Sequence, residues 1–137
     1  MSYISTADYF GLWANHPDAT LARVSAAEDM LDKVNGLLEE AEAHRVELKV
    51  NPATQTHVSG QNFGGFRPED CPQGASNSSH KVGRGVDIYD PDEALDRWIT
   101  DAILESHGLF RESPSATKSW VHLTDRAPGS GRRTFNP

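Results

Sequence analysis

The sequence has little cysteine, few basic residues and no long hydrophobic run, and each shortage excludes a class of protein. With one cysteine, Cys71, the chain cannot form an internal disulfide. The 13 Lys and Arg residues are outnumbered by 20 Asp and Glu residues, and the net charge is −7. Because phosphate neutralisation needs clustered basic side chains, we expect no nucleic-acid partner and no adsorption to anionic membrane. No apolar stretch approaches the roughly 18 residues of a membrane span.

The first residues do not have the pattern expected of a secretion signal. Residues 1–4 have neither the basic start nor the apolar run of a signal peptide, so we expect the protein to be cytoplasmic when it is made. A length of 137 residues predicts a single domain over residues 1–137. The hydrophobic share is 36%, which indicates that much of this domain is loop.

Three segments carry helix signals. Ser5 can begin a short helix, and Asp90-Pro91 can begin another that ends at Gly108. The clearest pattern follows Ser25 and Glu28, which have the spacing of a capping box. Apolar residues then recur at spacings of three and four and predict one buried face: Met30, Leu31, Val34, Leu37, Leu38 and Ala41.

Short apolar segments predict strands between these helices. Residues 86–89 and 119–123 have the composition of strands, residues 46–50 alternate apolar and charged side chains, and residues 57–60 are a further candidate. The expected fold is therefore α+β, with two or three helices packed on a small, mostly antiparallel sheet. We expect the functional site on the open face of this sheet.

His80 and Asp87 are the residues around which we expect the chain to be organised. His80 ends a loop, Asp87 lies in the strand predicted at 86–89, and two glycines between them permit a tight bend. Imidazole and carboxylate are both good zinc ligands. The alternative is a structural pair, joined by a hydrogen bond and without metal.

His122 is the candidate for a third ligand, because a catalytic zinc usually has three protein ligands and one open position. It lies in the strand predicted at 119–123, with Trp120 on the same face. The long loop 60–79 joins two site segments, which favours a role as a cleft wall. Its only basic residue, Arg67, has a planar guanidinium that suits a substrate carboxylate; a surface salt bridge is the alternative.

Three motifs resemble those of the M15 metallopeptidases, the group of D-alanyl-D-alanine carboxypeptidases and phage endolysins. The stretch from Ser79 to Asp87 resembles the S-x-H-x-x-G-x-A/G-x-D signature, and residues 120–122 resemble the W-x-H segment. Ser59-Gly60, followed by Arg67-Pro68, resembles the S-G-x-R-P segment with an insertion. The motifs stand in the family's order and cover roughly residues 46 to 123.

The resemblance implies a zinc-dependent hydrolase that cleaves a peptide bond in peptidoglycan stem peptides, as a carboxypeptidase or an endopeptidase. It implies Zn2+ ligands at His80, Asp87 and His122. It also implies that Arg67 binds substrate or stabilises the transition state, with Ser59 and Trp120 as further substrate contacts. Such an enzyme would be related to phage or prophage, and would reach the wall after lysis, through a holin or within a phage particle.

One position departs from the family pattern. The family's acidic base stands three positions before the last histidine ligand, and that position here is Ser119. A serine hydroxyl is no base at neutral pH unless another group activates it. Asp125 is the first substitute candidate, with Glu112 and Asp90 as flanking carboxylates, and the metal alone can support a slow reaction. The alternative is a catalytically inactive zinc domain that binds cell wall or forms part of a phage particle.

Overall fold

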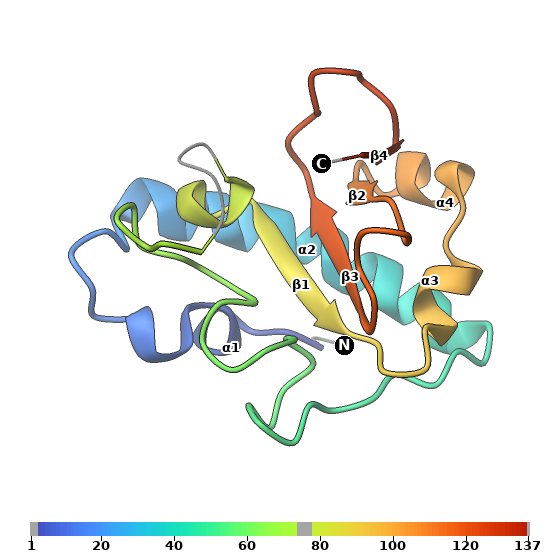
Figure 1. Cartoon of the computed structure of the whole chain (residues 1–137), viewed down its shortest axis with the longest axis horizontal. Coiled ribbons are helices and arrows are strands. Elements are labelled where there is room, and N and C mark those ends of the chain that lie inside the picture. The colour runs from blue at the N-terminus through green and yellow to red at the C-terminus, as the bar shows by residue number, and fades with distance from the viewer. Residues whose placement is uncertain (1–2, 74–77, 137) are drawn as a thin grey trace.

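The computed structural model describes residues 3–73 and 78–136 (Figure 1). Within these residues the chain forms an α+β fold with four α-helices and one open, mixed sheet of four strands. The helices are α1 (Thr6–Phe10), α2 (Leu21–Ala43), α3 (Ala94–Trp98) and α4 (Asp101–Ser106), and 3-10 turns lie at η1 (Gly11–Trp13) and η2 (Ser79–Val82). None of the described helices is long and apolar enough to cross a membrane.

The strands are β1 (Gly85–Tyr89), β2 (Phe110–Glu112), β3 (Trp120–Thr124) and β4 (Thr134–Phe135). Their order in the sheet is β1-β3-β2-β4. The β1–β3 and β2–β3 pairs are antiparallel, whereas β4 pairs with β2 in parallel, so the sheet is mixed. The strands predicted around Asp87 and His122 are confirmed.

Helix α2 is the longest element, and Figure 1 shows it behind β1 and β3. All six residues of the predicted apolar face are buried. The predicted start at Ser25 is wrong, because the Thr20 hydroxyl accepts from the Arg23 amide and caps the helix more than a turn earlier. The helix start predicted at Ser5 is confirmed, and Ser5 and Asp8 form a capping box at the start of α1.

The single helix predicted after Asp90 is instead two short helices. The chain is extended at Ile99, and Thr100 caps α4 by accepting from the Ile103 amide at 3.2 Å. Asp90 holds the start of α3, since its carboxylate accepts from the amides of Leu95 and Asp96 at 3.0 Å each. A second good N-cap residue inside the sequence, Thr100, therefore explains the break.

The strands predicted at 46–50 and 57–60 are absent from the described structure, where Val58 forms an isolated bridge with Ile88 and residues 46–50 form none. The second segment nevertheless follows the outer edge of β1. The Ser59 amide donates to the Asp87 carbonyl at 2.8 Å, and the Asp87 amide donates to the Gly64 carbonyl at 2.7 Å. A loop therefore takes the place of a fifth strand and fixes the backbone of Asp87 from its outer side.

Side-chain alternation divides the central strands into two faces. Val86, Ile88, Val121 and Leu123 are buried in the same core as the apolar face of α2. Asp87 and His122 point to the opposite face of the same strands. Packing against α2 therefore fixes the register that brings these two polar side chains together.

Leu37 and Leu21 of α2 provide a matched test of this core. Leu37 is fully buried, whereas Leu21 is 90% exposed. We expect Leu37→Ala to lower the free energy of unfolding by about 3 kcal/mol, because it leaves a cavity in a packed interior. Leu21→Ala should change it by less than about 0.5 kcal/mol. Urea denaturation measures both, and equal effects would contradict the packing of α2 on the sheet.

Candidate metal centre

Asp87 and His122 face each other across two antiparallel strands. They are register partners on β1 and β3. The His122 Nδ1 atom lies 2.9 Å from the Asp87 Oδ1 atom. Because one strand pair positions both side chains, their approach depends on backbone hydrogen bonds rather than on a mobile loop.

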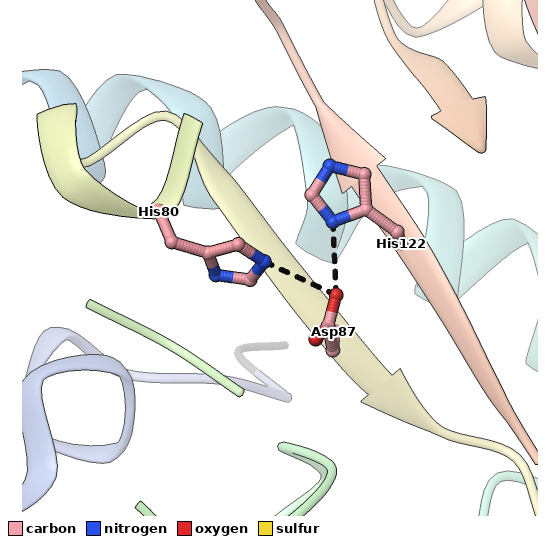
Figure 2. A group of neighbouring side chains, drawn as sticks. All are labelled: His80, Asp87 and His122. Atoms are coloured by element: carbon pink, nitrogen blue, oxygen red, sulfur yellow. Dashed lines mark hydrogen bonds and ion pairs between the residues drawn. The ribbon is translucent and has the colours of Figure 1, made fainter. Parts of the chain in front are cut away.

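His80 reaches the same carboxylate from η2, as Figure 2 shows. Its Nε2 atom lies 3.3 Å from Asp87 Oδ1, and its Nδ1 atom lies 2.8 Å from the Gly65 carbonyl oxygen. A carbonyl can only accept, so Nδ1 carries the proton. In a neutral ring the Nε2 lone pair then points toward Asp87, which is the orientation of a metal ligand whose second nitrogen is held by the protein.

Ser79 holds the far side of the His122 ring. Its Oγ atom lies 3.2 Å from His122 Nε2, and the side chain is buried. If Nδ1 faces a metal, Nε2 carries the proton and donates to this hydroxyl. Gly85 makes room for the contact, because a Cβ atom there would lie 2.1 Å from Ser79 Oγ. Ser78, Ser79 and Asp90 are near enough in sequence to give such support, and Ser79 is the one in contact with a ring nitrogen of His122.

The three side chains are largely withdrawn from solvent, with 4% of His80, 13% of Asp87 and 9% of His122 exposed. Burial alone would raise the pKa of Asp87. The opposing attraction and hydrogen bonds of the two histidines outweigh it and hold the pKa well below its usual range. Asp87 is therefore a carboxylate at neutral pH.

The donor set fits a divalent metal ion. One ligand atom from each of His80, Asp87 and His122 lies within 4.8 Å of the other two. Two imidazole nitrogens and one carboxylate oxygen are a donor set that zinc accepts. The predicted triad is thus a group of three residues that can hold a metal ion.

A cleft of about 610 Å³ opens over these donors. Its walls carry both charge and aromatic surface, from Arg67, Glu112, Trp120, Arg126 and Phe135. The Arg67 Nε atom donates to the Phe63 carbonyl at 2.7 Å, and its Nη2 atom lies 3.5 Å from Asp87 Oδ2. Arg67 is thus anchored at one end and lies beside the triad at the other.

The other predicted catalytic residues lie elsewhere. Ser119 is exposed with φ of 77°, and its carbonyl accepts from the Asp90 amide at 3.1 Å. The Asp125 carboxylate accepts from Arg84 at 2.8 Å and from Lys33 at 3.3 Å. Neither residue lines the cleft, and nor does Ser59, whereas Trp120 does.

Sequence reasoning missed one wall of the cleft. Residues 126–129 and Phe135 line it, whereas the sequence favours a solvated tail over residues 126–133, with contact between its arginines and an anionic substrate as the alternative. Strand β4 returns this segment to the sheet by pairing with β2. A strand of two residues is too short to give a recognisable strand pattern in the sequence. The position of Arg126, just beyond the strand that carries His122, was the one available signal.

A second group of possible ligands, His16, Asp18 and Asp70, lies closer to solvent. The Arg23 guanidinium lies beside this group, because its Nη1 atom donates to the Asp18 carbonyl at 2.8 Å. An adjacent guanidinium repels a cation, so this group is the poorer site.

Comparisons with family models, with curated proteins and with solved structures find no match to this chain. The donor geometry and the cleft therefore carry the functional argument.

Proposed function

We propose that this protein is a zinc-dependent hydrolase that cleaves a peptide bond in peptidoglycan stem peptides, and that it is related to the M15 metallopeptidases. The observation that carries the proposal is the grouping of His80, Asp87 and His122 at the floor of a cleft, with Arg67 beside them. Asp87 and His122 point away from the core that β1 and β3 share with α2, and His80 approaches them from η2. The choice of peptidoglycan rests on the motif resemblance.

In this proposal, different residues bind the metal, orient its ligands and bind the substrate. His80, Asp87 and His122 hold the metal, while the Gly65 carbonyl and the Ser79 hydroxyl fix the two imidazole rings. A bound zinc ion would activate water and polarise the scissile carbonyl. Arg67 would bind a substrate carboxylate through its guanidinium fork. Trp120 offers an aromatic wall against which the peptide can pack.

The test is cleavage of purified peptidoglycan and of isolated muropeptides, with products identified by mass spectrometry. We expect the zinc-loaded protein to release a peptide fragment or an amino acid, a chelator to stop the release, and added zinc to restore it. Chelator-insensitive release would exclude the metal-dependent mechanism. The mass of the product would distinguish carboxypeptidase from endopeptidase action.

Arg67 gives this proposal a residue-level test. Arg67→Lys keeps the positive charge but loses the planar guanidinium fork. We expect KM to rise about tenfold, because one charge-assisted hydrogen bond to the substrate is lost, and we expect the zinc content to stay unchanged. Arg97→Lys is the matched control, since Arg97 lies on α3 outside the cleft. An unchanged KM in Arg67→Lys would show that the substrate carboxylate binds elsewhere.

A second candidate function is a zinc domain that binds cell wall or forms part of a phage particle without catalysis. The replacement of the family's acidic base by Ser119 favours it. In that case the zinc-loaded protein would co-sediment with peptidoglycan and release no product.

A further inference from the structure

We infer that Glu112 is the carboxylate that accepts and returns the proton during hydrolysis in this cleft. The inference rests on the proposed function and supplies the residue that the sequence pattern lacks at Ser119. It assigns the acid-base role to β2, the strand next to the one that carries His122.

The strand register places Glu112 beside the metal centre. Phe110 is opposite Thr124 and Arg111 is opposite Leu123, so continuing the register by one residue places Glu112 opposite His122. Residues opposite each other in an antiparallel pair share a face of the sheet, with Cβ atoms roughly 5 Å apart. Glu112 and His122 both line the cleft, as expected for two residues on the same face of the sheet.

Ser119 does not share this face. It precedes the first residue of β3, Trp120, so the side-chain alternation of the strand does not extend to it. Its positive φ and its carbonyl contact with the Asp90 amide place it at the entry to β3, outside the cleft. We therefore expect no gain of activity from Ser119→Glu.

The competing carboxylates are already occupied. Asp125 is held by Arg84 and Lys33, and Asp90 accepts two amides at the start of α3. The Glu112 carboxylate, by contrast, has no hydrogen bond or ion pair within residues 3–73 and 78–136. It is half-buried. A carboxylate that lines the cleft and is not engaged in the fold is available to a water molecule and to the substrate.

The proton balance of the reaction needs one such group. As the water oxygen bonds to the scissile carbonyl carbon, the Glu112 carboxylate takes one proton from that water. When the carbon–nitrogen bond breaks, the Glu112 carboxyl gives the proton to the leaving amine. The products are a carboxylic acid and an amine, and Glu112 is regenerated as a carboxylate.

The test compares Glu112→Gln with the parent and with Glu105→Gln, the same substitution at an exposed site on α4. Turnover of muropeptides should fall at least about 100-fold in Glu112→Gln and stay unchanged in Glu105→Gln. Two readouts separate proton transfer from structural damage. The zinc content of Glu112→Gln should equal that of the parent. Calorimetry measures the Kd of Glu112→Gln for the uncleaved muropeptide, and this Kd should lie within about threefold of the parent's KM.

Each other result overturns the inference in its own way. Turnover within threefold of the parent would show that Glu112 takes no part in proton transfer, and the proposed function would stand. Loss of zinc along with turnover would show that Glu112 supports the metal centre instead. A zinc-loaded parent that releases no product would overturn the proposed function and this assignment together.

Discussion

Replacing His122 by alanine is expected to reduce the zinc content of the purified protein from near one ion per chain to near zero. The substitution removes one of three donors and leaves only His80 and Asp87, too few to hold a zinc ion. Elemental analysis of protein purified without a tag measures the change directly. His44→Ala is the matched control, because His44 lies at the end of α2 and its ring contacts the Glu40 carbonyl.

Thermal unfolding is a second test of metal binding at the same site. A ligand that binds only the folded state at 1,000 times its Kd stabilises that state by about 4 kcal/mol. For a chain of this size we expect a chelator to lower the Tm of the parent by roughly 10 °C and to leave that of His122→Ala unchanged. Absence of zinc from both proteins, even after metal is added, would contradict the hydrolase and the inactive zinc domain alike. His80 and Asp87 would then be a structural pair.

Gly65→Ala is expected to damage both the fold and the metal centre. A Cβ atom at this position would lie 2.0 Å from the Tyr9 carbonyl oxygen, a backbone atom that no side-chain rotation can move. We expect a loss of about 3 kcal/mol in the free energy of unfolding of the metal-free protein, measured by urea denaturation. The Gly65 carbonyl also orients His80, so its displacement should weaken zinc binding by at least tenfold.

Gly129→Ala is the control for this substitution. No atom lies within 4 Å of a Cβ built at Gly129. Both stability and zinc affinity, the latter measured by competition with a chelating dye, should therefore stay close to those of the parent. If Gly65→Ala matched the control in both measurements, the close approach of the loop to α1 would be contradicted.

The parts of the fold that local pattern determines were predictable from the sequence. The buried face of α2, the strands around Asp87 and His122, and the helix start at Ser5 each depend on residues close in sequence. The grouping of His80 with Asp87 also follows from a short loop that contains two glycines. These features need no knowledge of distant contacts.

The rest of the site depends on how short segments pair at long range. Strand β2 has three residues and β4 has two, so neither gives a periodic signal. Glu112 therefore remained only a flanking candidate, although the β2–β3 register, continued by one residue, places it opposite His122. Ser119 was chosen by motif position, whereas in the structure it lies just before β3 with φ of 77° and does not line the cleft.

The loop that follows the outer edge of β1 also has a consequence for association between molecules. An unpaired strand edge is a template for pairing with another chain and hence for aggregation. Along β1 this edge is already bonded, since Ser59 and Gly64 bond the backbone of Asp87 and His57 accepts from the Tyr89 amide. The opposite edge of the sheet, β4, is two residues long. The same loop that fixes a metal ligand therefore also protects the sheet from recruiting a second copy of the chain.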